Sequence, residues 1–411
     1  MADLLPVLAA LAAGPASPPG GTAGADDAAT FVAPAYGGAG LDAVLPAVLG
    51  ALAGSGTGAG ADPAATTRLG LPAATRACVV LVDGLGWENL RERAGHASFL
   101  RPRLNDTAAA RPLTTTYPST TAAALGTFGT GAAPGRTAML GYTVREPASG
   151  RLVGLVSWDG VPEPRTWQRE PPLLEVAAAG GLPVTSVGPA RFAGSGMTVA
   201  ALRGGTYVPA EALADRADVA ARALRSPGLV YLYWGDVDKV GHHQGWRSAA
   251  WGHALESFDA ELGRLARSLP AGTLLVVTAD HGMVDVDPAA RWDVATDPVL
   301  REDVALVGGE PRASHLYLVP GADPRAVAAR WSAHLGEAAL VGVREDVVAA
   351  GLFGDVAPHA LPVIGDVVVA ATGRTSVVDS RTQTPASLTL VGMHGSLTPA
   401  EMRIPLVVDL T

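Results

Sequence analysis

The chain has 411 residues, of which 48% are hydrophobic and 17% charged, and its formal net charge is −9. This length suits one large domain, or one domain that carries a sizeable insertion. An acidic chain without a run of Lys or Arg lacks the cationic phosphate contacts that duplex nucleic acid requires, so we do not expect duplex nucleic acid as a partner. No apolar stretch approaches the length that crosses a bilayer, so we do not expect a membrane as a partner either.

The first fourteen residues are rich in Ala and Leu and resemble the core of a signal peptide. A secretory leader normally begins with basic residues, whereas here the first basic residue is Arg68. We therefore expect a cytoplasmic protein and leave export open. Residues 14–30 have the composition of a loose tail, and 41–53 are predicted to form an amphipathic helix. Residues 1–70 are thus predicted to be an Ala/Gly/Pro-rich segment with one helix.

From residue 77, apolar strand-like runs alternate with helical patterns. The pattern predicts strands at 78–82, 184–187, 229–234 and 274–278, and helices at 87–93, 121–129, 209–224 and 246–268. Strands that alternate with helices are typical of a doubly wound α/β fold, with a mostly parallel central sheet and helices on both faces.

Residues 290–387 have a different pattern of predicted elements, with many turns. They contain short predicted strands at 304–307, 315–319 and 366–370, and a predicted helix at 324–335. We interpret them as an inserted α+β cap. The chain is expected to return to the main sheet with a strand at 388–391 and to end with a strand at 404–408, which leaves 71–289 and 388–411 as the main domain.

Acidic and imidazole side chains stand at the ends of the strand-like runs, where an open α/β sheet builds its active site. They are Asp83, Asp238, His242, Asp280, His281 and His394. The one cysteine, Cys78, offers neither a disulfide nor a thiolate cluster. A metal would therefore use carboxylate, imidazole and hydroxyl ligands, which suit Zn²⁺, with Mn²⁺ or Fe as alternatives. The set predicts a two-metal phosphoryl-transfer enzyme.

A run of hydroxyl residues at 114–121 supplies candidate nucleophiles. Pro118 within this run fits the start of a helix, with Ser119 or Thr120 at the cap. A hydroxyl at a helix N-terminus meets free backbone N–H groups and the positive end of the helix dipole, which favour a phosphate. The pattern leaves the choice among these hydroxyls open.

These motifs resemble the alkaline phosphatase superfamily of two-metal hydrolases, and most closely its bacterial nucleotide pyrophosphatase/phosphodiesterase-type branch. The resemblance covers roughly residues 77–408 and rests on Asp-Lys-Val-Gly-His at 238–242, Asp-His-Gly-Met at 280–283 and His-Gly at 394–395. It implies one metal held by Asp83, Asp280, His281 and the nucleophile, and a second held by Asp238, His242 and His394.

The resemblance also implies a nucleophile. Family nucleophiles stand nine residues before a Thr-Gly pair, here Thr130-Gly131, which selects Thr121. An alignment on the Thr-aromatic-Pro start selects Thr116 instead, and Thr120 is a third candidate. The implied reaction cleaves a phosphodiester or pyrophosphate bond of a small phosphorylated substrate, such as a nucleotide, through a phospho-threonine intermediate. A phosphomonoesterase and a phosphomutase-like isomerase with the same metal core are the alternatives.

The substrate end of the site departs from the family pattern. Ala122 follows Thr121 where nucleotide pyrophosphatases carry an aromatic residue, and the stretch 139–142 lacks their Asn. Aromatic residues such as Trp87 and Tyr142 are candidates for the pocket wall, and Arg312 and His315 are candidates to reach a substrate phosphate from the cap. We expect a monomer or a homodimer.

Overall fold

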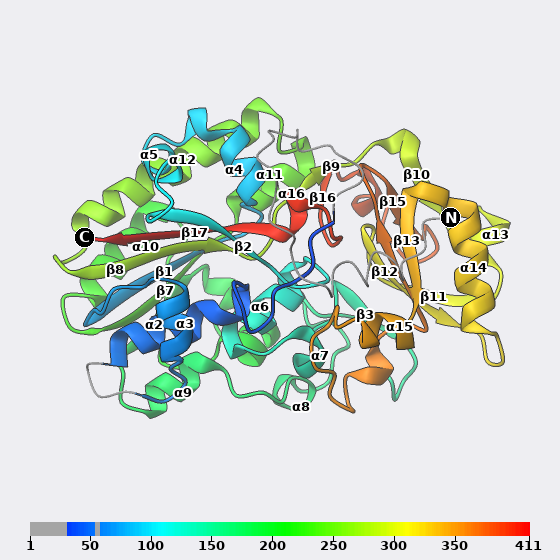
Figure 1. Ribbon diagram of the computed structural model, residues 1–411, viewed down its shortest axis with the longest axis horizontal. Helices are drawn as coiled ribbons and strands as arrows, with labels where there is room; N and C mark the ends of the chain where they lie inside the picture. The colour runs from blue at the N-terminus through cyan, green and yellow to red at the C-terminus, as the bar shows by residue number, and fades with distance from the viewer. Residues whose placement is uncertain (1–30, 54–57) are drawn as a thin grey trace.

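The computed structural model describes residues 31–53 and 58–411, and these residues fold around two large β-sheets (Figure 1). The predicted tail at 14–30 and the leader-like start lie outside the described residues. The larger sheet has the order β2 (Ala110–Thr114), β17 (Arg403–Leu410), β8 (Thr273–Ala279), β1 (Arg76–Val82), β7 (Gly228–Trp234), β5 (Val184–Gly188) and β6 (Thr206–Pro209).

Within the described part of the chain, β17 alone runs against the other strands of this sheet. The central strands β1 and β8 are buried along almost their whole length. A strand that is covered on both faces has a continuous apolar sequence, and this is why β1 and β8 could be predicted from the sequence. The prediction of a mostly parallel central sheet is confirmed.

Helices cover both faces of the larger sheet (Figure 1). Above it in this view lie α4 (Trp87–Glu92), α5 (Leu100–Leu104), α11 (Asp236–Gln244) and α12 (Ala249–Ser268). Below it lie α2 (Val44–Leu52), α3 (Pro63–Arg68), α6 (Thr121–Thr130) and α9 (Leu173–Ala179). Helix α10 (Leu213–Ala223) packs against α12 and the strands β5 and β7.

The helix predicted at 41–53 is present as α2, but it is not amphipathic. Its residues are buried except for Pro46 and Gly50, which are partly exposed. The reason is that α3, α6, α9 and β1 all pack around it, so no face of the helix meets solvent freely. The segment 1–70 also contains a second described helix, α3, whose N-cap Asp62 accepts bonds from two backbone N–H groups.

The smaller sheet is antiparallel and has the order β13 (Ala339–Val343), β14 (Val367–Ala371), β12 (Ala313–Leu318), β11 (Val304–Glu310), β3 (Thr143–Arg145) and β4 (Leu152–Gly154). Helix α14 (Pro324–Leu335) packs against it and buries Val327 and Trp331. Strands β3 and β4 join this sheet from outside the predicted insertion, so the division at 290–387 stays a prediction.

Short elements connect these layers. They are α7 (Pro134–Thr137), α8 (Pro164–Trp167), α13 (Pro298–Arg301), α15 (Arg344–Ala349), α16 (Pro399–Met402), and the paired strands β10 (Arg291–Asp293) with β15 (Ser376–Val378) and β9 (Val284–Asp285) with β16 (Gly392–Met393). None of the helices within residues 31–53 and 58–411 combines the length and the hydropathy that crossing a bilayer requires.

The predicted strand at 388–391 is wrong. The chain there forms a short 3₁₀ turn at Ser387–Thr389, and Leu390 lines a cavity instead of the main core. Residues 392 and 393 then form β16, which pairs with β9, the next strand after β8. The chain re-enters the larger sheet only with β17, near the predicted last strand.

Candidate active site

Three neighbouring parallel strands carry the first group of predicted ligands. In the register of the sheet, Val82 at the end of β1 faces both Trp234 at the end of β7 and Ala279 at the end of β8. The residues that follow these ends therefore start at one level of the same edge. They are Asp83 after β1, Asp280 and His281 after β8, and Asp238 and His242 on α11 after β7.

Two shorter elements bring the remaining candidates to this edge. The pairing of β16 with β9 places His394 beside the loop after β8, where its ring stacks on that of His281 with centroids 3.5 Å apart. Helix α6 begins at Thr121, whose Oγ1 lies 3.2 Å from His281 Nε2. Residues more than 270 positions apart in the sequence thus meet at one place.

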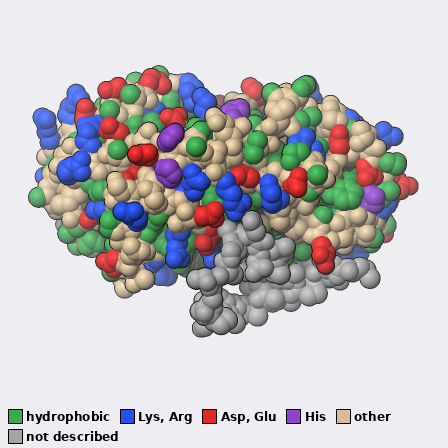
Figure 2. Space-filling model, turned by 90° about the horizontal axis from the view of Figure 1, so that it is seen from above, with side chains coloured by type: hydrophobic (Ala, Val, Ile, Leu, Met, Phe, Trp, Pro, Cys, Tyr) green, Lys and Arg blue, Asp and Glu red, His purple; other side chains and the backbone are tan. Residues whose placement is uncertain are grey.

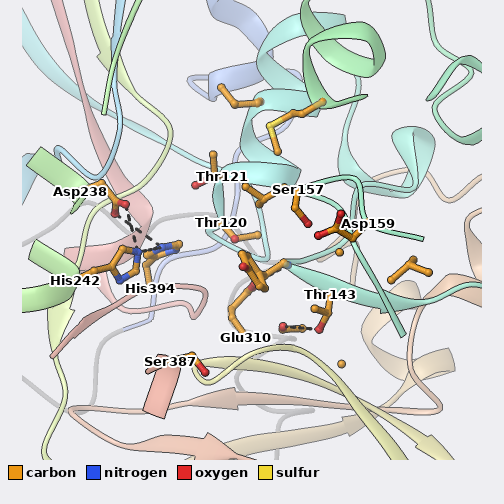
Figure 3. A pocket seen from close by; sticks show the side chains of 18 of the residues that line it. Thr120, Thr121, Thr143, Ser157, Asp159, Asp238, His242, Glu310, Ser387 and His394 are labelled. Atoms are coloured by element: carbon orange, nitrogen blue, oxygen red, sulfur yellow. Dashed lines mark hydrogen bonds and ion pairs between the residues drawn. The ribbon is translucent and has the colours of Figure 1, made fainter. Parts of the chain in front are cut away.

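The side chains form two adjoining clusters that share Asp238. In the first, His242 Nε2 lies 3.3 Å from Asp238 Oδ2 and 3.3 Å from His394 Nε2 (Figure 3). In the second, ligand atoms of Asp83, Asp238 and His281 all lie within 4.8 Å of one another. Asp280 Oδ2 lies 3.5 Å from His281 Nε2 and extends the second cluster.

Each histidine is oriented by a backbone carbonyl. The Nδ1 atoms of His242, His281 and His394 lie 2.7, 3.0 and 2.9 Å from the carbonyl oxygens of Gly392, Gly282 and Ser119. A carbonyl can only accept, so each Nδ1 donates its proton to the carbonyl, which leaves each Nε2 on the side of the carboxylates. This is the arrangement that metal-binding histidines adopt.

The carboxylates leave oxygens for cations in the same space. Asp83 Oδ1, Asp238 Oδ1 and Asp280 Oδ2 are buried and have no hydrogen-bond partner among the described residues. The opposite oxygens are held: Asp83 Oδ2 accepts from the Tyr233 hydroxyl, and Asp280 Oδ1 accepts from Gly84 N–H at 3.0 Å. Buried polar atoms rarely remain unpaired, so the donor set fits a pair of divalent cations.

Without cations the cluster is electrostatically unfavourable. Burial raises the pKa of Asp83 well above its usual range, and the charges of Asp280 and Asp238 raise it further. Burial lowers the pKa of His394, and the neighbouring histidines lower it too. Burial also opposes the charge of His242, but Asp238 outweighs it and raises its pKa to about 9. Metal binding would therefore release protons from this cluster.

The clusters lie at one side of a cavity of about 1270 Å³ between the two sheets. Thr120, Thr121, Asp83, Asp238, His242 and His394 line it from the larger-sheet side, while Asp280 and His281 lie buried behind them. The opposite wall comes from the smaller sheet and includes Thr143 and Glu310 (Figure 3). The cavity is large enough for a substrate with two ester arms.

Of the residues that were predicted to contact the substrate, some line the cavity and others do not. Tyr142 lines the cavity with 53% of its surface exposed. Trp87 is buried at the start of α4 and does not line it. Arg312 is fully buried against Glu401, and His315 is buried between Leu140 O and Gly365 N. Neither of these two side chains lines the cavity.

Two residues at the site were not predicted. Tyr233 orients Asp83 through its hydroxyl, and Glu310 projects into the cavity from the end of β11 (Figure 3). Both stand near the end of a strand, as the predicted ligands do. That position was their only sequence signal, because Tyr233 reads as one more strand aromatic and Glu310 as a turn residue beside Pro311.

The chain is similar to proteins of known class. Residues 77–397 match the model of the type I phosphodiesterase/nucleotide pyrophosphatase family. A phosphopentomutase from Chelativorans sp. (strain BNC1) is 36% identical over 145 residues, which are 34% of this chain and 32% of that protein. The match thus spans about a third of that relative's length.

Two solved structures share the fold. Murine ectonucleotide pyrophosphatase/phosphodiesterase 5 has a TM-score of 0.65 at 17% identity, with 81% of this chain and 88% of that chain covered. Phosphonoacetate hydrolase from Sinorhizobium meliloti 1021, in complex with phosphonoformate, has a TM-score of 0.64 at 21% identity, with 82% and 91% covered.

Proposed function

Because the chain belongs to the type I phosphodiesterase/nucleotide pyrophosphatase family, a branch of the alkaline phosphatase superfamily, we propose that it hydrolyses small phosphodiesters or pyrophosphates. The observation that supports this best is the convergence of seven side chains from five segments, with the Thr121 hydroxyl 3.2 Å from His281 Nε2 at the cavity wall. A murine relative's threonine-to-alanine variant, described as inactive, was solved in complex with AMP, which fits a threonine nucleophile.

We assign Asp83, Asp280, His281 and Thr121 to one divalent cation, and Asp238, His242 and His394 to the other. Zn²⁺ suits this carboxylate and imidazole set, with Mn²⁺ or Fe as alternatives. When bound, the cations supply Lewis-acid stabilisation of the phosphoryl oxygens and lower the pKa of the Thr121 hydroxyl.

The chain's own residues position the reacting groups. Thr121 is the first residue of α6, so the free N–H groups of the first helical turn and the positive end of the helix dipole lie beside its hydroxyl and favour a phosphoryl group. Thr121 Oγ1 forms a bond to phosphorus as the bond to the leaving alcohol or phosphate breaks. Water then hydrolyses the threonine phosphate ester, which regenerates the hydroxyl.

The test compares three chromogenic substrates on metal-stripped and zinc-reconstituted protein. We expect a chelator to abolish release of p-nitrophenolate and Zn²⁺ to restore it. The kcat/KM for bis-p-nitrophenyl phosphate and thymidine 5′-p-nitrophenyl phosphate should exceed that for p-nitrophenyl phosphate by at least about tenfold, since only the diesters carry a second ester arm that the cavity can bind. A preference for the monoester would instead support a phosphomonoesterase.

The similarity to a phosphopentomutase favours one other function, a phosphomutase-like isomerase. Such an enzyme moves phosphate within a sugar phosphate and releases none to water. Incubation of the reconstituted protein with a pentose 5-phosphate, followed by ³¹P NMR, separates the two. A shifted phosphate ester without inorganic phosphate would replace the hydrolase proposal.

A further inference from the structure

Glu310 is a buried carboxyl group at the cavity wall that the proposed reaction does not use. It is 8% exposed, and its Oε2 accepts a hydrogen bond of 2.8 Å from Tyr142 N–H. Its Oε1 is buried without a hydrogen-bond partner, and no Lys, Arg or His in the described part of the chain forms an ion pair with it. The side chain points into the cavity (Figure 3).

The carboxyl group lies between the segments that carry the nucleophile and a metal ligand. On one side is Thr120, the residue before Thr121, which lines the cavity beside Glu310 (Figure 3). On the other side is Gly395, the residue after His394, where an added Cβ would stand 2.7 Å from Glu310 Cγ and 3.1 Å from Oε1. Glu310 is thus beside the place where the phosphoryl group would sit.

Resting on the proposed function, we infer that Glu310 accepts a hydrogen bond from a hydroxyl or ammonium group close to phosphorus on the substrate's ester arm. The neighbours of Glu310 adjoin the proposed reacting centre, so we place the donor on the part of the arm next to the ester oxygen. The substrate class is therefore a phosphate ester of an alcohol that carries a hydroxyl or an amine on the neighbouring carbon.

The burial of the Glu310 carboxyl group supports this assignment. Burial raises the pKa of Glu310 to about 8, and the bond from Tyr142 N–H only partly opposes that rise. An unpaired buried acceptor is expensive, and a donor brought by the substrate would satisfy it.

The test uses a matched series of p-nitrophenyl phosphodiesters whose second arm is ethyl, 2-hydroxyethyl or 2-aminoethyl. The arms are of similar size and differ in their donor. For the zinc-reconstituted protein we expect kcat/KM to rise by at least about tenfold from ethyl to 2-aminoethyl, since charge-assisted hydrogen bonds are the strong ones. The 2-hydroxyethyl arm should fall between them, after subtraction of its spontaneous cleavage.

Two variants and one control assign the preference to the residue. Glu310→Gln keeps the shape but cannot ionise, and Glu310→Ala removes the acceptor. Both should retain metal content and hydrolyse the ethyl diester within about threefold of wild type, while the preference for 2-aminoethyl falls to twofold or less. Glu345→Gln, which removes an exposed cap carboxylate away from the cavity, should keep the full preference.

The outcomes are separable. Equal hydrolysis of all three arms by the wild type overturns the inference about Glu310 but leaves the hydrolase proposal standing. An equal loss on all three arms in Glu310→Gln also overturns it, because the carboxyl group would then act on the phosphoryl group. Failure of the reconstituted protein to cleave any arm refutes the proposed function itself.

Discussion

Three candidate threonines near the start of α6 have different surroundings. Thr121 Oγ1 lies 3.2 Å from His281 Nε2 at the centre of the ligand cluster. Thr120 is the N-cap of α6 and lines the cavity beside Glu310 (Figure 3). Thr116 is fully buried and donates a hydrogen bond of 2.8 Å to Pro118 O. The geometry favours Thr121 over the other two because only its hydroxyl adjoins both the metal ligands and the cavity.

We therefore predict that Thr121→Ala lowers kcat by at least about a thousandfold, since removal of a nucleophile leaves only binding and electrostatic contributions. Bound zinc, measured by mass spectrometry of the metal, should fall little because six other ligands remain. Thr120→Ala is the matched control and should keep kcat within about tenfold. Near-normal turnover in Thr121→Ala, together with loss of turnover in Thr120→Ala, would assign the nucleophile role to Thr120 instead.

The side chains of the two clusters could be predicted from sequence, whereas the positions of the candidate cap residues could not. Asp238, His242, Asp280 and His281 stand in short fixed patterns after strands, and strand register brings such patterns together. The place of a cap side chain depends on how the two sheets pack, which leaves no local pattern. His315 illustrates this, because its environment is set by Leu140 and Gly365, which lie far from it in sequence.

His315 carries a pH prediction of its own. Its Nδ1 accepts from Gly365 N–H and its Nε2 donates to Leu140 O, so the neutral ring is fully bonded. Burial lowers its pKa from 6.5 to about 4. The unfolded chain therefore binds a proton at a higher pH than the folded one, and stability from this group is complete above pH 6.5 and lost as pH falls toward 4.

Between pH 7 and 5 this loss amounts to about 2 kcal/mol. We expect urea unfolding to show this loss as a difference in unfolding free energy, between wild type and a His315→Gln variant, that becomes smaller as the pH falls from 7 to 5. A difference that stays constant with pH would mean that the ring takes up a proton in the folded state as readily as in the unfolded one.

At the scale of elements, the turn between β1 and α4 shows how backbone geometry holds the site. Gly84 has φ +70°, and its N–H donates to Asp280 Oδ1. An added Cβ would stand 2.8 Å from Asp238 Cβ and 3.0 Å from Asp238 Cα. Residues with a side chain disfavour this φ, and here the side chain would also push α11 away from β1.

Gly84→Ala should therefore weaken zinc binding by roughly 10–100-fold, because it moves Asp238 away from both clusters. Gly321→Ala is a matched control, since Gly321 has φ +89° and open space around it. That variant should lose about 1–2 kcal/mol of stability from the backbone alone and bind zinc normally. Zinc titration in the presence of a competing chelator measures both, and equal affinities would show that the Asp238 contact is unimportant.

Elements with a continuous pattern were predicted, and those without one were missed. Strand β2 contains Arg111 and Pro112 and is buried only in part, so its alternation is broken. Strands β3 and β4 have three residues each, too few for any period to be visible. The apolar run at 388–391 has the composition of a strand, but its side chains face the cavity and the surface.

At the scale of the whole molecule, the surface and the junction between the sheets differ in character. On the face seen in Figure 2, Lys and Arg side chains are interspersed with Asp and Glu. The junction instead contains a fully buried ion pair between Arg312, just before β12, and Glu401 on α16. Arg312 Nη2 lies 2.7 Å and Nε 2.9 Å from the two carboxylate oxygens. Ser396 N–H also donates to Glu401 Oε1 at 3.0 Å, which connects the pair to the His394 loop.

This pair fixes how the smaller sheet meets the larger one, and we expect its disruption to be costly. Arg312→Met leaves the Glu401 carboxylate buried without its partner, and the free energy of unfolding should fall by about 3–5 kcal/mol. The double variant Arg312→Met/Glu401→Gln removes both charges and should be more stable than Arg312→Met alone. An exposed pair, Arg325 with Asp346, serves as the control, and Arg325→Met should cost about 1 kcal/mol or less. Urea unfolding of all four proteins measures these differences. If Arg312→Met costs no more than Arg325→Met, the two sheets are held together by apolar packing and the buried pair contributes little to their attachment.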